Sequence, residues 1–157
     1  MGIEIERKFL VSQDQWREGA TGSFYCQGYL VHDPQVTLRV RVVGDRGLLT
    51  IKGKVENLSR PVFEYEIPLS DAREMLQLWC GDQLIEKNRY RIPVGDLVWE
   101  VDEFLGVNQG LVLAEVELTS PDQSISLPEW IGPEVSGDIR YYNSYLVKHP
   151  YRTWQNS

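Results

Sequence analysis

Charged side chains recur at every second position along several segments of the chain, and their sign changes from one segment to the next. Side chains two residues apart point to the same side of a β-strand, so each segment would project its charges from one face. Paired carboxylates suit a hard divalent cation, which takes oxygen ligands. Paired basic groups suit phosphate, because Arg offers two parallel donors and Lys a compact charge. These segments carry Glu4, Glu6 and Lys8; Arg39 and Arg41; Thr50, Lys52 and Lys54; Glu64 and Glu66; Lys87, Arg89 and Arg91; Glu100 and Asp102; and Glu115 and Glu117.

A solvated sheet face also carries polar residues at alternate positions, and for any single strand that is the usual reason for such a stripe. Here nearly all of these positions are charged, with little Ser, Thr or Gln among them. Like charges two residues apart gain nothing on an open face and repel mildly. From the residues alone, two interpretations stay open: a β-sandwich with charged outer faces, and a closed barrel whose charged faces line a lumen.

The elements that must position these charges are mainly β-strands joined by turns. Consecutive strands of this kind pair antiparallel, and eight of them can close a barrel. Alternation of apolar and polar residues predicts eight strands, over about residues 3–11, 24–31, 36–43, 48–54, 62–69, 84–92, 97–104 and 111–119.

Two or three helices are expected to cover the barrel. Ser70 is a predicted N-cap, Gly81 is a predicted stop, and apolar residues follow at helical spacing between them. A final helix is predicted over 141–148, before Pro150, and a short weak one begins near Ser120. Residues 127–133, with two prolines and a glycine, are predicted to be irregular. The apolar positions of the first helix are Ala72, Met75, Leu76 and Trp79.

The chain has 157 residues, which predicts one domain over 1–157. Lys and Arg total 16 and Asp and Glu total 23, so the net charge is −7. This acidic balance argues against nucleic acid as a partner. It does not argue against a small polyanion, because net charge says nothing about where the charges lie.

The remaining composition predicts a cytoplasmic protein with no membrane partner. Two cysteines, Cys26 and Cys80, cannot form a disulfide framework and are expected to be reduced thiols. No apolar run approaches the roughly 18 residues of a membrane span. The first residues mix acids with bases, which is typical of neither a secretory signal nor a transit peptide. Whether the chain forms a homodimer stays open.

The charged segments fall within an ordered series of short motifs that covers nearly the whole chain. The series consists of Glu4-Ile5-Glu6-Arg7-Lys8 (an ExExK motif), Gln27-Gly28-Tyr29-Leu30, Leu38-Arg39-Val40-Arg41, Thr50-Ile51-Lys52, Glu64-Tyr65-Glu66, Glu86-Lys87-Asn88-Arg89-Tyr90, Trp99-Glu100-Val101-Asp102, Glu115-Val116-Glu117 and Asp138-Ile139-Arg140-Tyr141-Tyr142-Asn143. It resembles the CYTH superfamily, also called triphosphate tunnel metalloenzymes. The resemblance implies a mainly β fold, a closed eight-stranded antiparallel barrel with a charged lumen.

The resemblance also implies roles for individual residues. Tyr29 and Lys52 are candidates, with Lys8, for the catalytic groups that position or activate water. Lys52 would act as a base only if neighbouring cations lower its pKa; a second metal that ionises its own water is the alternative. Metal ligands for Mg²⁺ or Mn²⁺ are expected at Glu4, Glu6, Asp102, Glu115 and Glu117, with Glu64 and Glu66 either holding a second metal or orienting basic residues. Substrate-binding residues are expected at Lys8, Arg39, Arg41, Lys52, Lys87, Arg89 and Arg140.

The activity implied is metal-dependent hydrolysis of a triphosphate. Short bacterial members of the superfamily include inorganic triphosphatases, and the compact chain favours tripolyphosphate, which would give pyrophosphate and phosphate. A larger substrate would call for an added domain that selects a nucleoside or thiamine. The alternatives are a nucleoside or thiamine triphosphatase, an adenylate cyclase of class IV type, and a polyphosphate-binding module without turnover.

Overall fold

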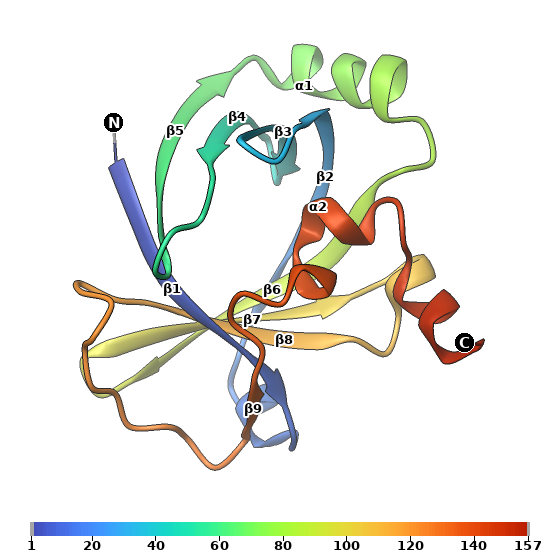
Figure 1. Cartoon of the computed structure of the whole chain (residues 1–157). Coiled ribbons are helices and arrows are strands. Elements are labelled where there is room, and N and C mark those ends of the chain that lie inside the picture. The colour runs from blue at the N-terminus through green and yellow to red at the C-terminus, as the bar shows by residue number, and fades with distance from the viewer. Residues whose placement is uncertain (1, 157) are drawn as a thin grey trace.

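A computed structural model describes residues 2–156, in which nine strands form one antiparallel sheet (Figure 1). Eight strands close a barrel in the order β1-β5-β4-β3-β2-β6-β7-β8, because β1 pairs with both β5 and β8. The predicted eight-stranded antiparallel barrel is therefore confirmed. The strands are β1 (Gly2–Val11), β2 (Gly22–His32), β3 (Val36–Val43), β4 (Arg46–Gly53), β5 (Ser59–Ile67), β6 (Ile85–Val94), β7 (Leu97–Phe104), β8 (Val112–Glu117) and β9 (Ile131–Glu134).

The ninth strand lies where the sequence predicts irregular chain. β9 pairs with β1 at Phe9 and Val11, past the residues of β1 that pair with β5 and alongside those that pair with β8. Pro133 is tolerated because β9 has β1 as its neighbour on one side and is an edge strand, where a missing N–H costs no ladder bond. The prediction for residues 127–133 was thus wrong over the last three of them.

The predicted helix over 70–81 forms, but its ends differ. α1 (Leu69–Met75) follows Pro68 rather than a Ser70 cap, and it continues into a π-helical segment, η2 (Leu76–Cys80). A π-helix has more residues per turn than an α-helix, so the buried face shifts by about one residue along the chain. Cys80 is therefore buried, while Trp79, predicted to face the barrel, is 64% exposed.

The other helices are short. η1 (Gln15–Arg17) and η3 (Gly106–Asn108) are single 3₁₀ turns, and η4 (Ile139–Tyr141), α2 (Asn143–Leu146) and η5 (Tyr151–Asn156) form the C-terminal segment. Of the predicted final helix only α2 is α-helical. The helix predicted near Ser120 is absent from the described residues; a turn stands there, and the Gln123 side chain accepts from the Thr119 N–H. No helix within residues 2–156 is both long and apolar enough to cross a membrane.

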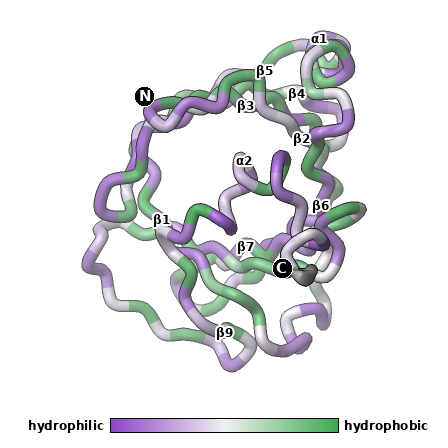
Figure 2. Tube along the Cα trace, turned by 45° about the vertical axis from the view of Figure 1, so that its right-hand side comes forward, coloured by the Kyte–Doolittle hydropathy of each residue, from purple (hydrophilic) through white to green (hydrophobic). Residues whose placement is uncertain are grey.

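The apolar core lies in three clusters, the first and third on the outer face of the barrel wall and the second inside the ring, where α2 packs against the inner faces of β6, β7 and β8. Hydrophobic and hydrophilic residues alternate along the strands, and α2 lies within the ring that the strands form (Figure 2). Trp99 and Phe9 belong to the first cluster, Phe104 and Leu146 to the second. The third packs the α1–η2 helix on β2 and β3. Because the apolar strand residues of the first and third clusters face outward, the alternate residues of those strands face the inside of the barrel.

Candidate active site

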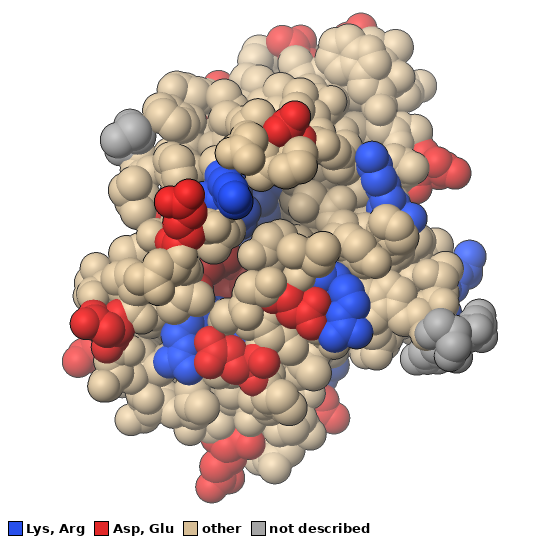
Figure 3. All heavy atoms as spheres, viewed as in Figure 1, with Lys and Arg blue, Asp and Glu red and all other residues tan. Residues whose placement is uncertain are grey.

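A cavity of about 360 Å³ lies inside the barrel, and each of the eight barrel strands contributes side chains to its lining. In the space-filling view the surface is hollowed where the barrel opens, and charged side chains of both signs lie in the hollow (Figure 3). The predicted site residues that line the cavity are Glu4, Glu6, Lys8, Tyr29, Arg39, Arg41, Lys52, Glu64, Lys87, Arg89, Glu115 and Glu117.

Two arginines of β3 are held by neutral partners. Arg39 donates to the Thr50 hydroxyl at 3.1 Å, and Arg41 Nε donates to the Gln27 amide oxygen at 2.7 Å. Burial and the neighbouring Arg39 and Arg89 lower the pKa of Arg41 to about 9. The buried Arg39 Nε has no hydrogen-bond partner within the described chain. This wall of the lumen therefore carries positive charge without a matching carboxylate.

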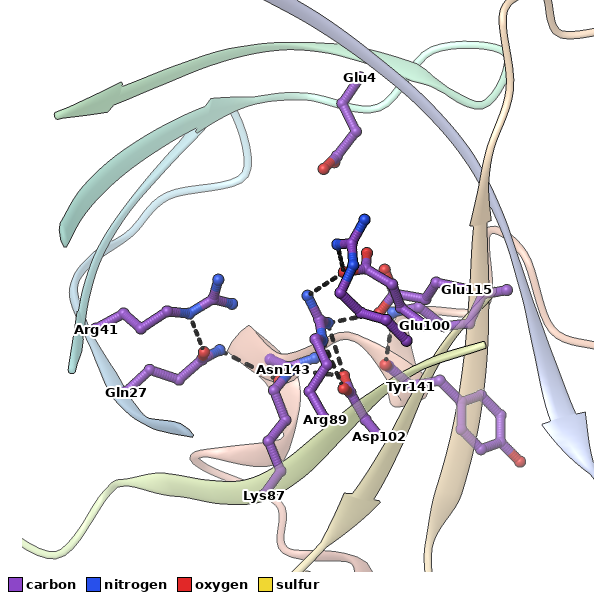
Figure 4. A network of polar contacts seen from close by, with 12 residues as sticks. Glu4, Gln27, Arg41, Lys87, Arg89, Glu100, Asp102, Glu115, Tyr141 and Asn143 are labelled. Carbon is purple, nitrogen blue, oxygen red and sulfur yellow. Dashed lines mark hydrogen bonds and ion pairs between the residues drawn. The ribbon is translucent and has the colours of Figure 1, made fainter. Parts of the chain in front are cut away.

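Two cations of β6 share one carboxylate. Asp102 accepts from Lys87 Nζ at 2.7 Å and from Arg89 at 2.7 and 2.8 Å, and its side chain is 1% exposed (Figure 4). Burial acts to raise the pKa of Asp102, but Arg89 and Lys87 outweigh it and bring the pKa below its ordinary value. Burial, with Arg89 and Arg41 nearby, lowers the pKa of Lys87. Asp102 is thus enclosed by its two partners, and it is not among the residues that line the cavity.

A second shared carboxylate lies on β1. Glu4 accepts from Lys52 Nζ at 3.2 Å and from Arg60 Nε at 3.1 Å. Burial and the neighbouring Arg39 lower the pKa of Lys52 to about 8. Lys52 therefore has the reduced pKa that a general base at this position would need.

The remaining acids of β1 and β8 lie close together. The Glu6 carboxyl is hydrogen-bonded to Glu115, and its pKa is raised well above the ordinary value by burial and by the charges of Glu115 and Glu4. Glu115 keeps a pKa well below the ordinary value, despite burial, because Lys8 and Arg89 face it. Glu117, also on β8, is exposed, and burial together with the charges of Glu4 and Glu100 raises its pKa.

These carboxylates fit a divalent cation by their chemistry. Glu6 and Glu115 lie close enough for the charge of Glu115 to raise the pKa of Glu6, and carboxylate oxygens are the ligands that Mg²⁺ and Mn²⁺ take. In residues 2–156 no three acidic, His or Cys side chains converge closely enough to enclose a metal as they stand. A cation at Glu6 and Glu115 would therefore keep several water ligands, as Mg²⁺ commonly does.

Two predicted residues form exposed ion pairs and do not line the cavity. Glu66 is exposed and pairs with Arg46 at 3.1 Å. Arg140 is 56% exposed and pairs with Asp138 at 2.7 Å. Neither is among the residues that line the cavity, so the structure does not bring them together with the other predicted side chains.

Comparison with known proteins identifies the family to which this barrel belongs. The CYTH domain model matches residues 2–144, nearly the whole chain. The chain belongs to the CYTH domain family. It is 49% identical, over 99% of both chains, to a protein of Acetivibrio thermocellus named inorganic triphosphatase.

Solved structures show the same fold. One is a crystal structure of an inorganic triphosphatase, with a TM-score of 0.66 and 34% identity over 94% of this chain and 95% of that chain. Another, from Pyrococcus horikoshii, has a TM-score of 0.59 and covers 97% of this chain and 99% of that one. At 18% identity this second likeness bears on the fold alone. The predicted resemblance to the CYTH superfamily is confirmed.

Three residues of the inner face of this CYTH barrel, Arg60, Gln27 and Asn143, have no role predicted from the sequence. Arg60 precedes the predicted strand over 62–69, although extending the even-numbered face of that strand backward by one step would have included it. Gln27 and Asn143 are neutral, so a search for charged stripes passes over them. Their contacts connect β2, β3, β6 and α2.

Proposed function

We propose that this chain hydrolyses a triphosphate, and that its substrate is inorganic tripolyphosphate, which yields pyrophosphate and phosphate. The observation that carries the proposal is the uncompensated positive wall of β3. Arg39 and Arg41 are both 8% exposed and line the lumen, and each donates a hydrogen bond to a neutral side-chain oxygen. A buried guanidinium without an anion is costly, so such a pair indicates a site built for an anionic ligand.

The chain's own cations would bind the phosphate chain. Arg39, Arg41 and Arg89 offer forked donors, while Lys52, Lys87 and Lys8 offer compact charges around the same cavity. Lys8 is oriented by a bond to the Tyr141 carbonyl at 3.0 Å. These groups hold the substrate in line for attack and stabilise the charge of a loose transition state.

The carboxylates Glu4, Glu6, Glu115 and Glu117 would hold a divalent cation, Mg²⁺ or Mn²⁺. When bound, the cation neutralises part of the negative charge of the phosphate chain. Asp102, predicted as a ligand, is instead proposed to orient Lys87 and Arg89, because both cations already occupy its oxygens.

Water must lose a proton as it attacks a terminal phosphorus. Lys52 faces the cavity with a pKa of about 8, so part of the population carries a neutral amine at neutral pH and accepts that proton. Tyr29 lines the same cavity, and its hydroxyl is proposed to orient the water. The bond from phosphorus to its bridging oxygen breaks, and pyrophosphate leaves.

A second cavity favours a second candidate, an organic triphosphate such as a nucleoside triphosphate. This cavity of about 700 Å³ shares Lys52, Arg60 and Tyr142 with the first one. Its lining includes the ring of Tyr145, stacked on His149 with centroids 4.2 Å apart. An aromatic pair at this position offers a surface for a flat organic group.

The decisive experiment measures phosphate release by the purified protein with Mg²⁺ or Mn²⁺. Tripolyphosphate, ATP, thiamine triphosphate and pyrophosphate are offered separately. We expect the highest kcat/KM with tripolyphosphate; a higher value with ATP would favour the second candidate. Folded protein that releases phosphate from no triphosphate would overturn the proposed activity, and tight binding without release would identify a binding module.

We further propose a cytoplasmic location and a small-molecule substrate for this protein. Cys26 and Cys80 are both free thiols in the structure, in keeping with a cytoplasmic protein. The acidic net charge of −7 supports a small-molecule substrate rather than a nucleic-acid partner. We also propose that residues 1–157 form one domain.

A further inference from the structure

Gln27 is a completely buried neutral residue on the inner face of β2. Its amide oxygen accepts from Arg41 Nε at 2.7 Å, and its amide nitrogen donates to Asn143 Oδ1 at 3.2 Å. A buried amide of this kind must satisfy both its donor and its acceptor groups. Gln27 does so between a substrate-facing arginine of β3 and the first residue of α2 (Figure 4).

Asn143 is the other end of this connection. The same Oδ1 atom that accepts from Gln27 accepts from Lys87 Nζ at 3.0 Å. Two neutral amides therefore link Arg41 on β3 to Lys87 on β6, across β2 and the segment that lies within the barrel ring. Neither amide carries charge, so the link orients both cations without neutralising either.

Arg41 has a neutral partner, as Arg39 does. Four other lumen cations are held by carboxylates: Glu4 holds Lys52 and Arg60, and Asp102 holds Lys87 and Arg89. A carboxylate orients a cation but offsets its charge toward a third, anionic group. A glutamine oxygen gives the same directional bond and leaves the full charge available.

We propose that Gln27 is a positioning residue for the substrate, anchored by Asn143: it aims Arg41 at the phosphate chain and preserves the charge of the guanidinium. The proposal rests on the proposed triphosphate substrate. It predicts that both the bond and the neutrality of residue 27 matter, and these two properties are separable by substitution.

Gln27→Glu is the sharper variant, because it is nearly isosteric and keeps an acceptor for Arg41 while adding a negative charge. We expect KM for tripolyphosphate to rise at least about tenfold and kcat to change less than about threefold, because ground-state and transition-state binding are lost together. Gln27→Leu removes the acceptor, and we expect KM to rise by a similar factor with a lower melting temperature. The matched control is Gln83→Glu, which adds the same charge at an exposed position and should leave KM unchanged.

Titration calorimetry with tripolyphosphate in the absence of metal separates this inference from the proposed activity. Wild-type protein that binds tripolyphosphate but does not hydrolyse it overturns the activity alone. Gln27→Glu protein with Kd and KM within about twofold of wild type overturns the positioning role, because a merely structural glutamine tolerates an isosteric acceptor. Should Gln27→Leu fail to fold, the Gln27→Glu variant still decides. Wild-type protein that neither binds tripolyphosphate without metal nor hydrolyses it with Mg²⁺ overturns both proposals.

Discussion

One strand, β7, shows the contrast between the two faces of the barrel wall. Its outward residues Trp99 and Val101 are fully buried among apolar neighbours, and its inward residue Asp102 is buried between two cations. Both faces exclude water, yet they do so with opposite chemistry. The outer face is held by apolar burial, and the inner face by charges that satisfy one another across strands.

The two faces therefore have different energetic roles. Apolar burial stabilises in proportion to area, by about 25 cal/mol per Å². Buried ion pairs give little net stability, because the desolvation of both charges offsets their attraction. We infer that the outer clusters stabilise the fold. The charged lumen adds little net stability and instead provides a surface for the substrate. Substitutions on the two faces should then separate stability from activity.

The largest expected effect is on the outer face, at Trp99. This side chain is fully buried and contacts the rings of Phe9 and Trp130 with centroids 5.6 and 5.9 Å away. Trp99→Ala should lower the free energy of unfolding by about 3–5 kcal/mol, because it removes a large apolar group and leaves a cavity. Urea unfolding measures this loss, and kcat per folded molecule should be unchanged.

Trp79 is the matched control for Trp99. It is 64% exposed on η2, so Trp79→Ala should change the free energy of unfolding by less than about 0.5 kcal/mol. Equal losses at the two positions would contradict the assignment of stability to the outer clusters.

The next effect is on the inner face, at Arg39. Arg39→Ala should lower kcat/KM for tripolyphosphate at least about 100-fold, because the guanidinium meets the substrate without a competing carboxylate. The melting temperature should stay within a few degrees of wild type or rise, since a buried charge close to other cations is removed. Steady-state kinetics tests the fall in kcat/KM, and thermal unfolding tests the melting temperature.

Arg17→Ala is the control for this substitution. Arg17 pairs with Glu103 at 2.9 Å on the outside of the barrel and does not line the lumen, so kcat/KM should be unchanged. Full activity of the Arg39→Ala variant would contradict the proposed role of the positive wall of β3 in substrate binding.

Much of this two-faced wall is predictable from local pattern. The segment over 36–43 was predicted as a strand with Arg39 and Arg41 on one face, and β3 has the same bounds. A one-residue slip would turn every charge outward, so the alternation fixes the facing of a strand once the apolar face is buried. Period two cannot predict the π-helical segment, where the buried residue shifts from Trp79 to Cys80.

Contacts within the lumen were less predictable, because they depend on which strands meet across it. Asp102 shares a charged stripe with Glu100, as a metal ligand would, but Lys87 and Arg89 lie on the neighbouring strand and take up its oxygens. Gln27 and Asn143 lie 116 positions apart and meet only because α2 folds into the ring. Sequence spacing predicts the face of a residue, and the closure of the barrel selects its partner.

A smaller effect on stability is expected where η2 packs against the outer face of β2. A Cβ atom at Gly28 would lie 2.5 Å from Cys80 Sγ, so Gly28→Ala must displace η2 from β2. The free energy of unfolding should fall by about 1–3 kcal/mol, as for other overpacked cores. Because the displacement is on the outer face, kcat/KM should stay within about threefold of wild type.

Cys80→Ala in the same protein tests the cause of that loss. Shortening residue 80 removes the clashing sulfur, so the double variant should recover part of the stability, and the two effects should be non-additive. Strict additivity in urea unfolding would show that Gly28 acts through something other than this contact.

The smallest effect is expected at the ion pair of Arg7 and Glu134, which lies outside the lumen. Arg7 donates to both Glu134 oxygens at 2.9 and 2.7 Å, joining β1 to β9, but the two side chains are 23% and 36% exposed. A double-mutant cycle to Ala should give a coupling energy of about 0.2–1 kcal/mol and leave kcat/KM unchanged.

The pH dependence of this coupling has a definite sign. Hydrogen bonding from Arg7 brings the pKa of Glu134 below its ordinary value, so the folded state favours the carboxylate. The coupling is then fully present above the ordinary pKa and is lost as pH falls through the lowered one. Urea unfolding of the four proteins at about pH 7 and about pH 3 should show it shrinking. A coupling of several kcal/mol, or one that grows in acid, would place this outer pair among the strongly coupled charges of the lumen.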